Sequence, residues 1–249
     1  MDATATVSYM SSAEDQATGP QPEVLAWWRD GERTLRTAID SIDDAGLAGP
    51  SLLPGWTRQT VVAHLARNAD ALVNLLTWAR TGVETPMYAT PDARGTGIEQ
   101  TASLPAADVR AEFAAAQARL TAAVDELPGP AWQARVRNPE DRMVPATDVP
   151  WMRTRETWVH AVDLNGPVTF ADIPPDVADA LIMNITTGWH NNGEAVGITF
   201  AAAGTGRRWG DGPRVVSAPR ADLLAWMTGR GEEAAIQFSG PSFQAPPWL

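Results

Sequence analysis

The stretch "GWTRQTVVAHLARNADALVNLLTWARTG", residues 55–82, has the clearest helical pattern in the chain. Thr57 is a suitable N-cap residue, and Gly82 is a suitable residue just beyond a helix C-terminus. Between them the apolar residues recur at helical spacing and form one stripe, made of Val61, Leu65, Leu72 and Leu76. The stretch therefore predicts a long amphipathic helix with one face for a core.

Three more segments predict helices that could pack against this one. They cover residues 22–43, residues 104–130, and a segment that starts near residues 148–150 and ends at 165–167. Four amphipathic helices predict a four-helix bundle. The stretch "VETPMYATPDARGTG", residues 83–97, reads as a loop. The connection from 82 to 104 is long for a simple hairpin, and long loops inside compact domains are often functional.

After residue 166 the pattern changes to shorter elements. A short helix is predicted at 174–189. Two strands, 196–204 and 213–219, flank a turn at 204–212, and a helix at 221–231 precedes a strand at 234–240. The sequence thus predicts a poorly ordered tail at 1–20, a helical bundle at 21–166 and a small α+β domain at 167–249.

Charge and hydropathy exclude several classes of partner. The net charge of −11 opposes binding to nucleic acid, and no basic stripe offsets it. No run of 18 or more apolar residues predicts a membrane span. The first 20 residues lack the basic and apolar regions of a secretory signal. We therefore expect a cytoplasmic protein that binds neither nucleic acid nor membrane.

The chain contains neither cysteine nor lysine, so all 19 basic residues are arginine. Without cysteine there are no disulfides, no thiolate metal ligands and no cysteine nucleophile. Without lysine, Schiff-base chemistry and the phosphate-binding lysine of P-loop proteins are also excluded.

A candidate metal site comes from "RTRETWVHAVDL", residues 153–164, in the fourth predicted helix. Glu156 and His160 are four residues apart, so they point from the same face of that helix. His64 borders the apolar stripe of the helix at 55–82 in the same way. Metal sites in helical bundles are built from side chains on facing helices, so these three residues are candidate ligands.

The residues alone leave other interpretations open. A histidine at the edge of a core is often only a hydrogen-bonded core residue, and a Glu–His pair one turn apart can be an ordinary ion pair. If the site exists, two imidazoles and a carboxylate suit zinc or non-haem Fe(II). Asp163 or Asn68 could then orient an imidazole, or be ordinary solvated side chains. His190, in "GWHNNGE", is interpreted as a structural or incidental helix-end residue.

With these residues placed, the sequence resembles the mycothiol-dependent maleylpyruvate isomerases, members of the DinB-like metal-binding bundle superfamily. Three long segments carry the resemblance, together with "GRG" and the terminal "PPWL". They are "LLPGWTRQTVVAHLARNA" (52–69), "WARTGVETPMYATPDAR" (78–94) and "MVPATDVPWMRTRETWVHAVDLNGPVTFADIP" (143–174). The resemblance covers nearly the whole chain but is looser in the C-terminal part.

This resemblance implies a mainly α fold, in which a DinB-like up-and-down bundle carries zinc and a small α+β domain closes over the site. His64, Glu156 and His160 match the family's metal ligands. Arg94 and Arg230 match residues that contact the substrate or assist catalysis, although surface charge is the plainer interpretation of both.

The resemblance also implies the chemistry, a cis–trans isomerisation of maleylpyruvate to fumarylpyruvate with zinc and mycothiol as cofactors. The thiolate of mycothiol would add to the C=C bond, the bond would rotate, and the thiol would then be eliminated. Zinc with an open position lowers the pKa of a bound thiol, so an external thiol could replace the missing cysteine. The partners would be this low-molecular-weight thiol and a small dicarboxylate.

Two other functions remain possible from the sequence. One is a mycothiol S-transferase, which would conjugate the thiol to another electrophile in detoxification or in a natural-product pathway. The other is a binding module or regulator without activity. The intact ligand set argues against the second, because a buried Glu–His group without a metal is costly to retain.

Overall fold

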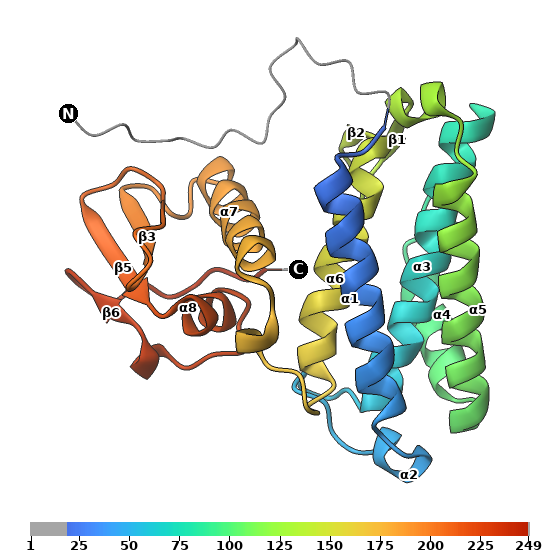
Figure 1. Cartoon of the computed structure of the whole chain (residues 1–249), viewed down its shortest axis with the longest axis horizontal. Coiled ribbons are helices and arrows are strands. Elements are labelled where there is room, and N and C mark those ends of the chain that lie inside the picture. Colours follow the sequence, from blue (N-terminus) through green and yellow to red (C-terminus); the bar gives the residue numbers. More distant parts are fainter. Residues whose placement is uncertain (1–18, 249) are drawn as a thin grey trace.

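The computed structural model describes residues 19–248. A bundle of long helices lies beside a smaller part built from a sheet and two helices (Figure 1). This mainly helical architecture, with a small α+β part after a four-helix bundle, is the one that the sequence predicts. Nearly all of the expected tail at residues 1–20 lies outside the described residues, so that expectation stays a prediction.

Four long helices form the bundle, and shorter elements connect them. The bundle helices are α1 (Pro22–Asp40), α3 (Arg58–Thr81), α5 (Ala106–Asp125) and α6 (Val149–Asp163). The connections contain helices α2 (Asp44–Leu47) and α4 (Ala93–Ala102), and an antiparallel hairpin of β1 (Arg135–Arg137) and β2 (Met143–Pro145).

Helix α3 begins and ends where the sequence predicts. The Thr57 hydroxyl accepts a hydrogen bond from the Thr60 N–H at 3.1 Å, which satisfies one of the free amides of the first turn. Gly82 takes a left-handed conformation with φ 72°, and its N–H donates to the Trp78 carbonyl at 2.8 Å. Both helix ends are thus fixed by local chemistry.

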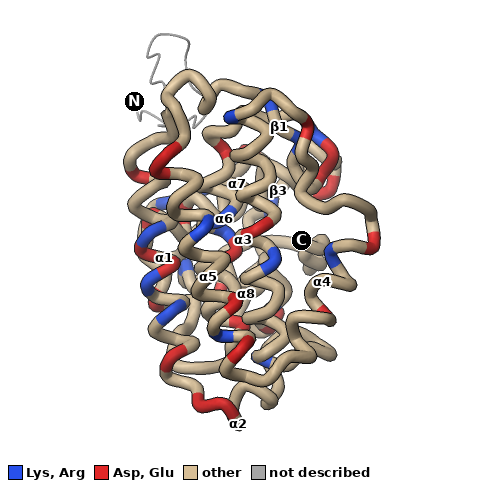
Figure 2. The backbone as a smooth tube through the Cα atoms, turned by 90° about the vertical axis from the view of Figure 1, so that its right-hand side faces the viewer, with Lys and Arg blue, Asp and Glu red and all other residues tan. Residues whose placement is uncertain are grey.

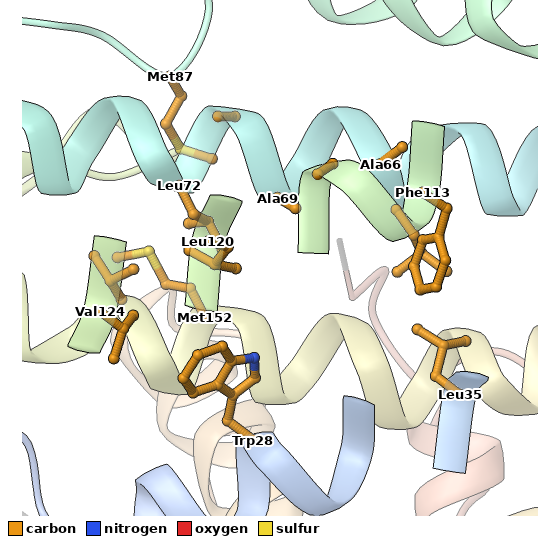
Figure 3. Close-up of a cluster of buried hydrophobic side chains, with 14 of the residues drawn as sticks. Trp28, Leu35, Ala66, Ala69, Leu72, Met87, Phe113, Leu120, Val124 and Met152 are labelled. Atoms are coloured by element: carbon orange, nitrogen blue, oxygen red, sulfur yellow. The ribbon is translucent and has the colours of Figure 1, made fainter. Parts of the chain in front are cut away.

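The bundle core is a continuous layer of aliphatic and aromatic side chains between the four helices. Figure 3 shows Leu72 of α3 and Leu120 of α5 above Trp28 of α1 and Met152 of α6. Met87, from the connection after α3, also packs into this layer. The predicted apolar stripe of α3 is fully buried here, which confirms that interpretation.

Helices α3 and α5 run in the same direction, and this explains the long connection between residues 82 and 104. Arg67 of α3 pairs with Glu112 of α5. Asp70, about one turn further along α3, pairs with Arg119, about two turns further along α5. The connection must therefore bring the chain back along the whole length of α3. In a plain up-and-down bundle each helix runs opposite to the one before it. Helices α3 and α5 are the one consecutive pair of the four bundle helices that does not.

The interpretation of residues 83–97 as a loop is wrong for its last part, because α4 begins at Ala93. Two glycines, at 95 and 97, lower the helix propensity and mask the helix in the sequence. Tertiary contacts supply the missing stabilisation. Ile98 is buried, and the Gln59 side chain donates to the Ala102 carbonyl at 2.8 Å.

The smaller part consists of a mixed sheet covered by α7 (Pro175–Asn191) and α8 (Arg220–Met227). Its strand order is β4-β3-β5-β6, with β3 and β5 parallel and the two edge pairs antiparallel. The strands are β3 (Ile198–Ala202), β4 (Arg208–Trp209), β5 (Arg214–Ala218) and β6 (Gln237–Phe238). The sequence placed β4 inside a turn, because a two-residue strand has no detectable periodicity.

The two parts share helix α6, which is buried on both sides. One side contributes Met152 to the bundle core, whereas Trp158 and Val162 belong to a second core with α7, α8 and the sheet. Trp27 of α1 joins this second core and donates from its indole N–H to Asp176 at 2.7 Å. The boundary expected at 166/167 falls just after α6, and it stays a prediction.

A buried ionic network crosses the bundle core and ties its four helices together. Arg153 of α6 is fully buried and donates to Glu32 of α1 at 2.7 Å. The same guanidinium donates to the Leu65 carbonyl at 2.9 Å and to the Asn68 side chain at 2.8 Å on α3. Glu32 also accepts from Gln117 of α5 at 2.7 Å. These contacts fix the register of α6 against α1 and α3.

Exposed charges follow a different pattern. Arginines and acidic residues are interspersed along α1, α3 and α5 on the face seen in Figure 2. An example is the pair of Arg29 and Asp125, both about half exposed. Among the described residues, no helix is long and apolar enough to cross a membrane.

Replacing Arg153 with Met should lower the free energy of unfolding by about 3–5 kcal/mol, because it leaves the Glu32 carboxylate buried without its cation. Chemical denaturation measures this loss. The matched change Arg29→Met, in the exposed pair with Asp125, should cost about 1 kcal/mol or less. A double variant Glu32→Met/Arg153→Met should recover part of the stability. Equal losses for Arg153→Met and Arg29→Met would contradict a role for burial.

Candidate metal centre

The three candidate ligands come from two helices that face each other in the bundle. His64 lies two turns into α3 and is 2% exposed. Glu156 and His160 lie one turn apart on α6, on the side that faces α3. The structure brings these residues together although His64 and Glu156 are 92 positions apart in the sequence.

Both imidazoles approach one carboxylate oxygen. His64 Nε2 lies 2.9 Å from Glu156 Oε2, and His160 Nε2 lies 3.2 Å from the same oxygen. Each residue offers one ligand atom, and these atoms all lie within 4.8 Å of one another. Two neutral imidazoles and a carboxylate are the donor set of many zinc sites with an open position, and they also suit Fe(II). The residues present therefore fit a divalent metal.

The second nitrogen of each imidazole has a different environment. His160 Nδ1 lies 2.8 Å from Asp163 Oδ2, so a proton on Nδ1 leaves Nε2 free to act as a ligand. His64 Nδ1 is buried and has no hydrogen-bond partner among the described residues. The His64 ring is instead held by an edge contact with Trp56, with ring centroids 5.7 Å apart. Packing orients one histidine and a hydrogen bond orients the other.

The charges of the site shift the pKa values of its members. Burial favours neutral His160, but hydrogen bonds to Asp163 and Glu156 outweigh burial and raise the pKa of His160 to about 9. Burial lowers the pKa of His64 and the Glu156 carboxylate only partly opposes this. Burial alone would raise the pKa of Glu156, yet its hydrogen bonds from both histidines hold that pKa well below the ordinary value.

Asp163 connects the site to the C-terminal part of the chain. Its side chain is fully buried and accepts two hydrogen bonds from Arg230, at 3.0 Å and 2.8 Å. The sequence offered Asp163 and Asn68 as residues that could orient an imidazole. Asp163 does contact a histidine, His160. Asn68 does not, because its side-chain oxygen accepts from Arg153.

The two arginines singled out in the sequence lie in different surroundings. Arg94 is exposed in the first turn of α4, and its charge helps to lower the pKa of His64. The side chain of Arg230 is 12% exposed and is engaged with Asp163. Whether either arginine contacts a substrate stays a prediction. His190 is exposed at the end of α7, as expected for an incidental residue.

Tyr88 is a member of this region that sequence reasoning missed. Burial raises the pKa of its hydroxyl, and the nearby Arg94 guanidinium opposes this shift. The charge of Glu156 also acts on it. A single tyrosine in a connection carries no periodic signal, so only the fold could place it near the candidate ligands.

Known proteins are similar to this chain over most of its length. Residues 28–165 match the family model described as "Mycothiol maleylpyruvate isomerase N-terminal domain". A crystal structure of the mycothiol-dependent maleylpyruvate isomerase is 36% identical, with a TM-score of 0.84, over 91% of this chain and 96% of that chain. A second solved structure, of a histidine-to-alanine mutant of that isomerase, gives the same values. A search of curated proteins found no significant match.

The raised pKa of His160 predicts a pH dependence for the metal-free protein. The folded-state pKa of about 9 exceeds the unfolded value of about 6.5, so the stabilisation is complete below 6.5 and is lost as the pH rises through 9. The free energy of unfolding should fall by about 3 kcal/mol across this interval. Denaturation in the presence of a chelator measures it. His160→Gln should flatten the profile and His190→Gln should not; a flat wild-type profile would contradict the assignment.

Proposed function

Because the chain belongs to the mycothiol maleylpyruvate isomerase family, we propose that it is a metal- and mycothiol-dependent isomerase that converts maleylpyruvate to fumarylpyruvate. The observation that carries the proposal is the convergence of His64, Glu156 and His160, whose ligand atoms lie within 4.8 Å of one another. The identity of the substrate and of the thiol in this proposal is taken from the isomerases to which the chain is similar.

The metal, which we take to be zinc, would be held by His64 Nε2, His160 Nε2 and Glu156 Oε2. When bound, it would lower the pKa of an external thiol, whose thiolate adds reversibly to the C=C bond so that the bond can rotate. The absence of cysteine supports the use of an external thiol, because the chain has no thiolate of its own. No cysteine thiolate of the chain competes with the external thiol for the metal.

The residues around the ligands would bind and orient the substrate. Arg94 is exposed beside Tyr88, and its planar guanidinium can hold a carboxylate through two parallel hydrogen bonds. A substrate with two carboxylates needs such local cations, since the chain as a whole carries a net charge of −11. The hydroxyl of Tyr88 would remain protonated at neutral pH and so be available as a hydrogen-bond donor.

The direct test is a spectrophotometric assay of the zinc-loaded protein with maleylpyruvate, with and without mycothiol. We expect conversion to fumarylpyruvate only when mycothiol is present, with the thiol not consumed. Consumption of the thiol in proportion to product would instead indicate an S-transferase. A protein that takes up no metal on titration would contradict the proposal and favour a binding module.

A matched pair of histidine variants tests the ligand assignment. His64→Ala should remove stoichiometric zinc and abolish turnover, because only two donors would remain. His190→Ala changes the same residue type at an exposed position and should keep both zinc and activity. Metal analysis on purified variants measures the occupancy, and circular dichroism checks that both variants fold. Full zinc occupancy in folded His64→Ala would refute the assignment.

A further inference from the structure

A continuous line of polar contacts joins the C-terminal part of the chain to the candidate metal centre. Arg230, in the segment after α8, donates to both oxygens of Asp163 at 3.0 Å and 2.8 Å. Asp163 Oδ2 lies 2.8 Å from His160 Nδ1, and His160 Nε2 lies 3.2 Å from Glu156 Oε2. Arg230 is therefore only one side chain away from a metal ligand.

The motif "GRG", residues 229–231, has a structural reason that directs Arg230 toward this line. Gly229 takes φ 76°, a left-handed conformation that ends α8 and reverses the chain. A Cβ on Gly231 would lie 2.6 Å from the backbone N of Trp226, so only glycine fits where this segment returns to α8. The Arg230 N–H then donates to the Ala225 carbonyl at 2.8 Å. The two glycines hold the arginine in one orientation.

Arg230 and Asp163 are also fixed by contacts of their own. One guanidinium nitrogen of Arg230 donates to the Thr228 carbonyl. On the bundle side, the Leu52 N–H donates to the Asp163 carbonyl at 2.9 Å. Arg58 donates to the carbonyl of Leu164 at 2.7 Å, which holds the end of α6. These hydrogen bonds fix the backbone around Asp163 and one nitrogen of the Arg230 guanidinium, so the two side chains are held facing each other.

The charges favour the same arrangement. Asp163 is fully buried, and an isolated carboxylate there would be strongly disfavoured. Arg230 supplies the compensating cation in a bidentate geometry, so Asp163 can stay ionised and accept from His160. A carboxylate that accepts from one imidazole nitrogen fixes the ring and leaves the other nitrogen to bind a metal.

We propose that Asp163 and Arg230 are positioning residues for the metal centre: Asp163 orients His160, and Arg230 from the C-terminal part holds Asp163. This inference rests on the proposed metal site. It gives Arg230 a role that does not require contact with the substrate. It also makes the affinity for the metal depend on the docking of the C-terminal part against the bundle.

The line of contacts from Arg230 through Asp163 to His160 is called the relay below. Zinc affinity, measured by competition with a chromophoric chelator, tests this relay without an activity assay. Asp163→Asn and Arg230→Ala should each weaken zinc binding about 10–100-fold, the usual effect of losing a partner of a metal ligand. Because Arg230 acts through Asp163, the double variant should bind zinc about as weakly as Asp163→Asn alone. Arg230→Lys, which keeps the charge but not the fork, should fall between wild type and Arg230→Ala.

Arg220→Ala is the matched control. Arg220 also lies in the C-terminal part and donates to a carboxylate, Asp179 Oδ1, at 2.7 Å. In this variant Asp179 keeps Arg207 as a second partner at 2.7 Å. Neither Arg220 nor Asp179 contacts a candidate ligand. Arg220→Ala should therefore bind zinc like the wild type, even if its melting temperature falls. An equal loss of affinity in Arg220→Ala would mean that any destabilisation of this part weakens the site, and would overturn the relay.

A second measurement reports on His160 directly. The chain has only three histidines, so ¹⁵N-labelled imidazoles give few signals to assign. In the zinc-loaded wild type, His160 should be protonated at Nδ1 with an Asp163 hydrogen bond. In zinc-loaded Arg230→Ala the Nδ1 proton of His160 should exchange faster with solvent. This measurement does not need the Asp163→Asn variant, so it tests the relay even if that variant does not fold.

The outcomes separate the relay from the metal site itself. A wild type that binds no zinc would overturn the proposed function, and the relay with it. A wild type that binds zinc, with unchanged affinity and an unchanged His160 signal in Arg230→Ala, would overturn the relay alone. Weakened affinity with a wild-type His160 signal would also count against it, because the effect would not pass through the imidazole.

Discussion

The burial of helix α6 on two sides is the constraint on which the rest of the structure depends. One side packs into the bundle and the other into the core of the C-terminal part. A helix buried in this way cannot rotate or slide without exposing apolar surface on both sides. Arg153, Glu156, His160 and Asp163 all lie on this helix, so their positions are fixed together.

The same burial makes three charges on α6, those of Arg153, Glu156 and Asp163, depend on partners elsewhere in the chain. Arg153 is paired with Glu32 of α1, and Asp163 with Arg230 of the C-terminal part. Glu156 lies between two histidines, one of them on α3. Removing one partner from such a pair costs more than the pair itself contributes, because the remaining charge is left desolvated. The ionic contacts therefore specify how the helices and the C-terminal part fit together, whereas the apolar cores supply most of the free energy of folding.

Much of this architecture could be predicted from local signals. Thr57 and Gly82 marked both ends of α3, and the four-residue spacing of Glu156 and His160 placed them on one face of α6. Helix α4 escaped prediction because its two glycines weaken the helical signal and its stability comes from contact with α3. Strand β4 escaped because two residues are too few for a pattern, and β3 provides its hydrogen bonds.

The sequence by itself determined which segments form the four bundle helices, which residues border their apolar faces and which chemistries are impossible without cysteine or lysine. These properties follow from backbone periodicity and from composition, so they need no knowledge of distant residues. Only the tertiary structure decided that His64 meets Glu156, that Arg230 reaches Asp163, and that α3 and α5 run parallel. Such pairings join residues tens of positions apart, and they are selected by how all the buried faces pack at once. No local pattern contains that information.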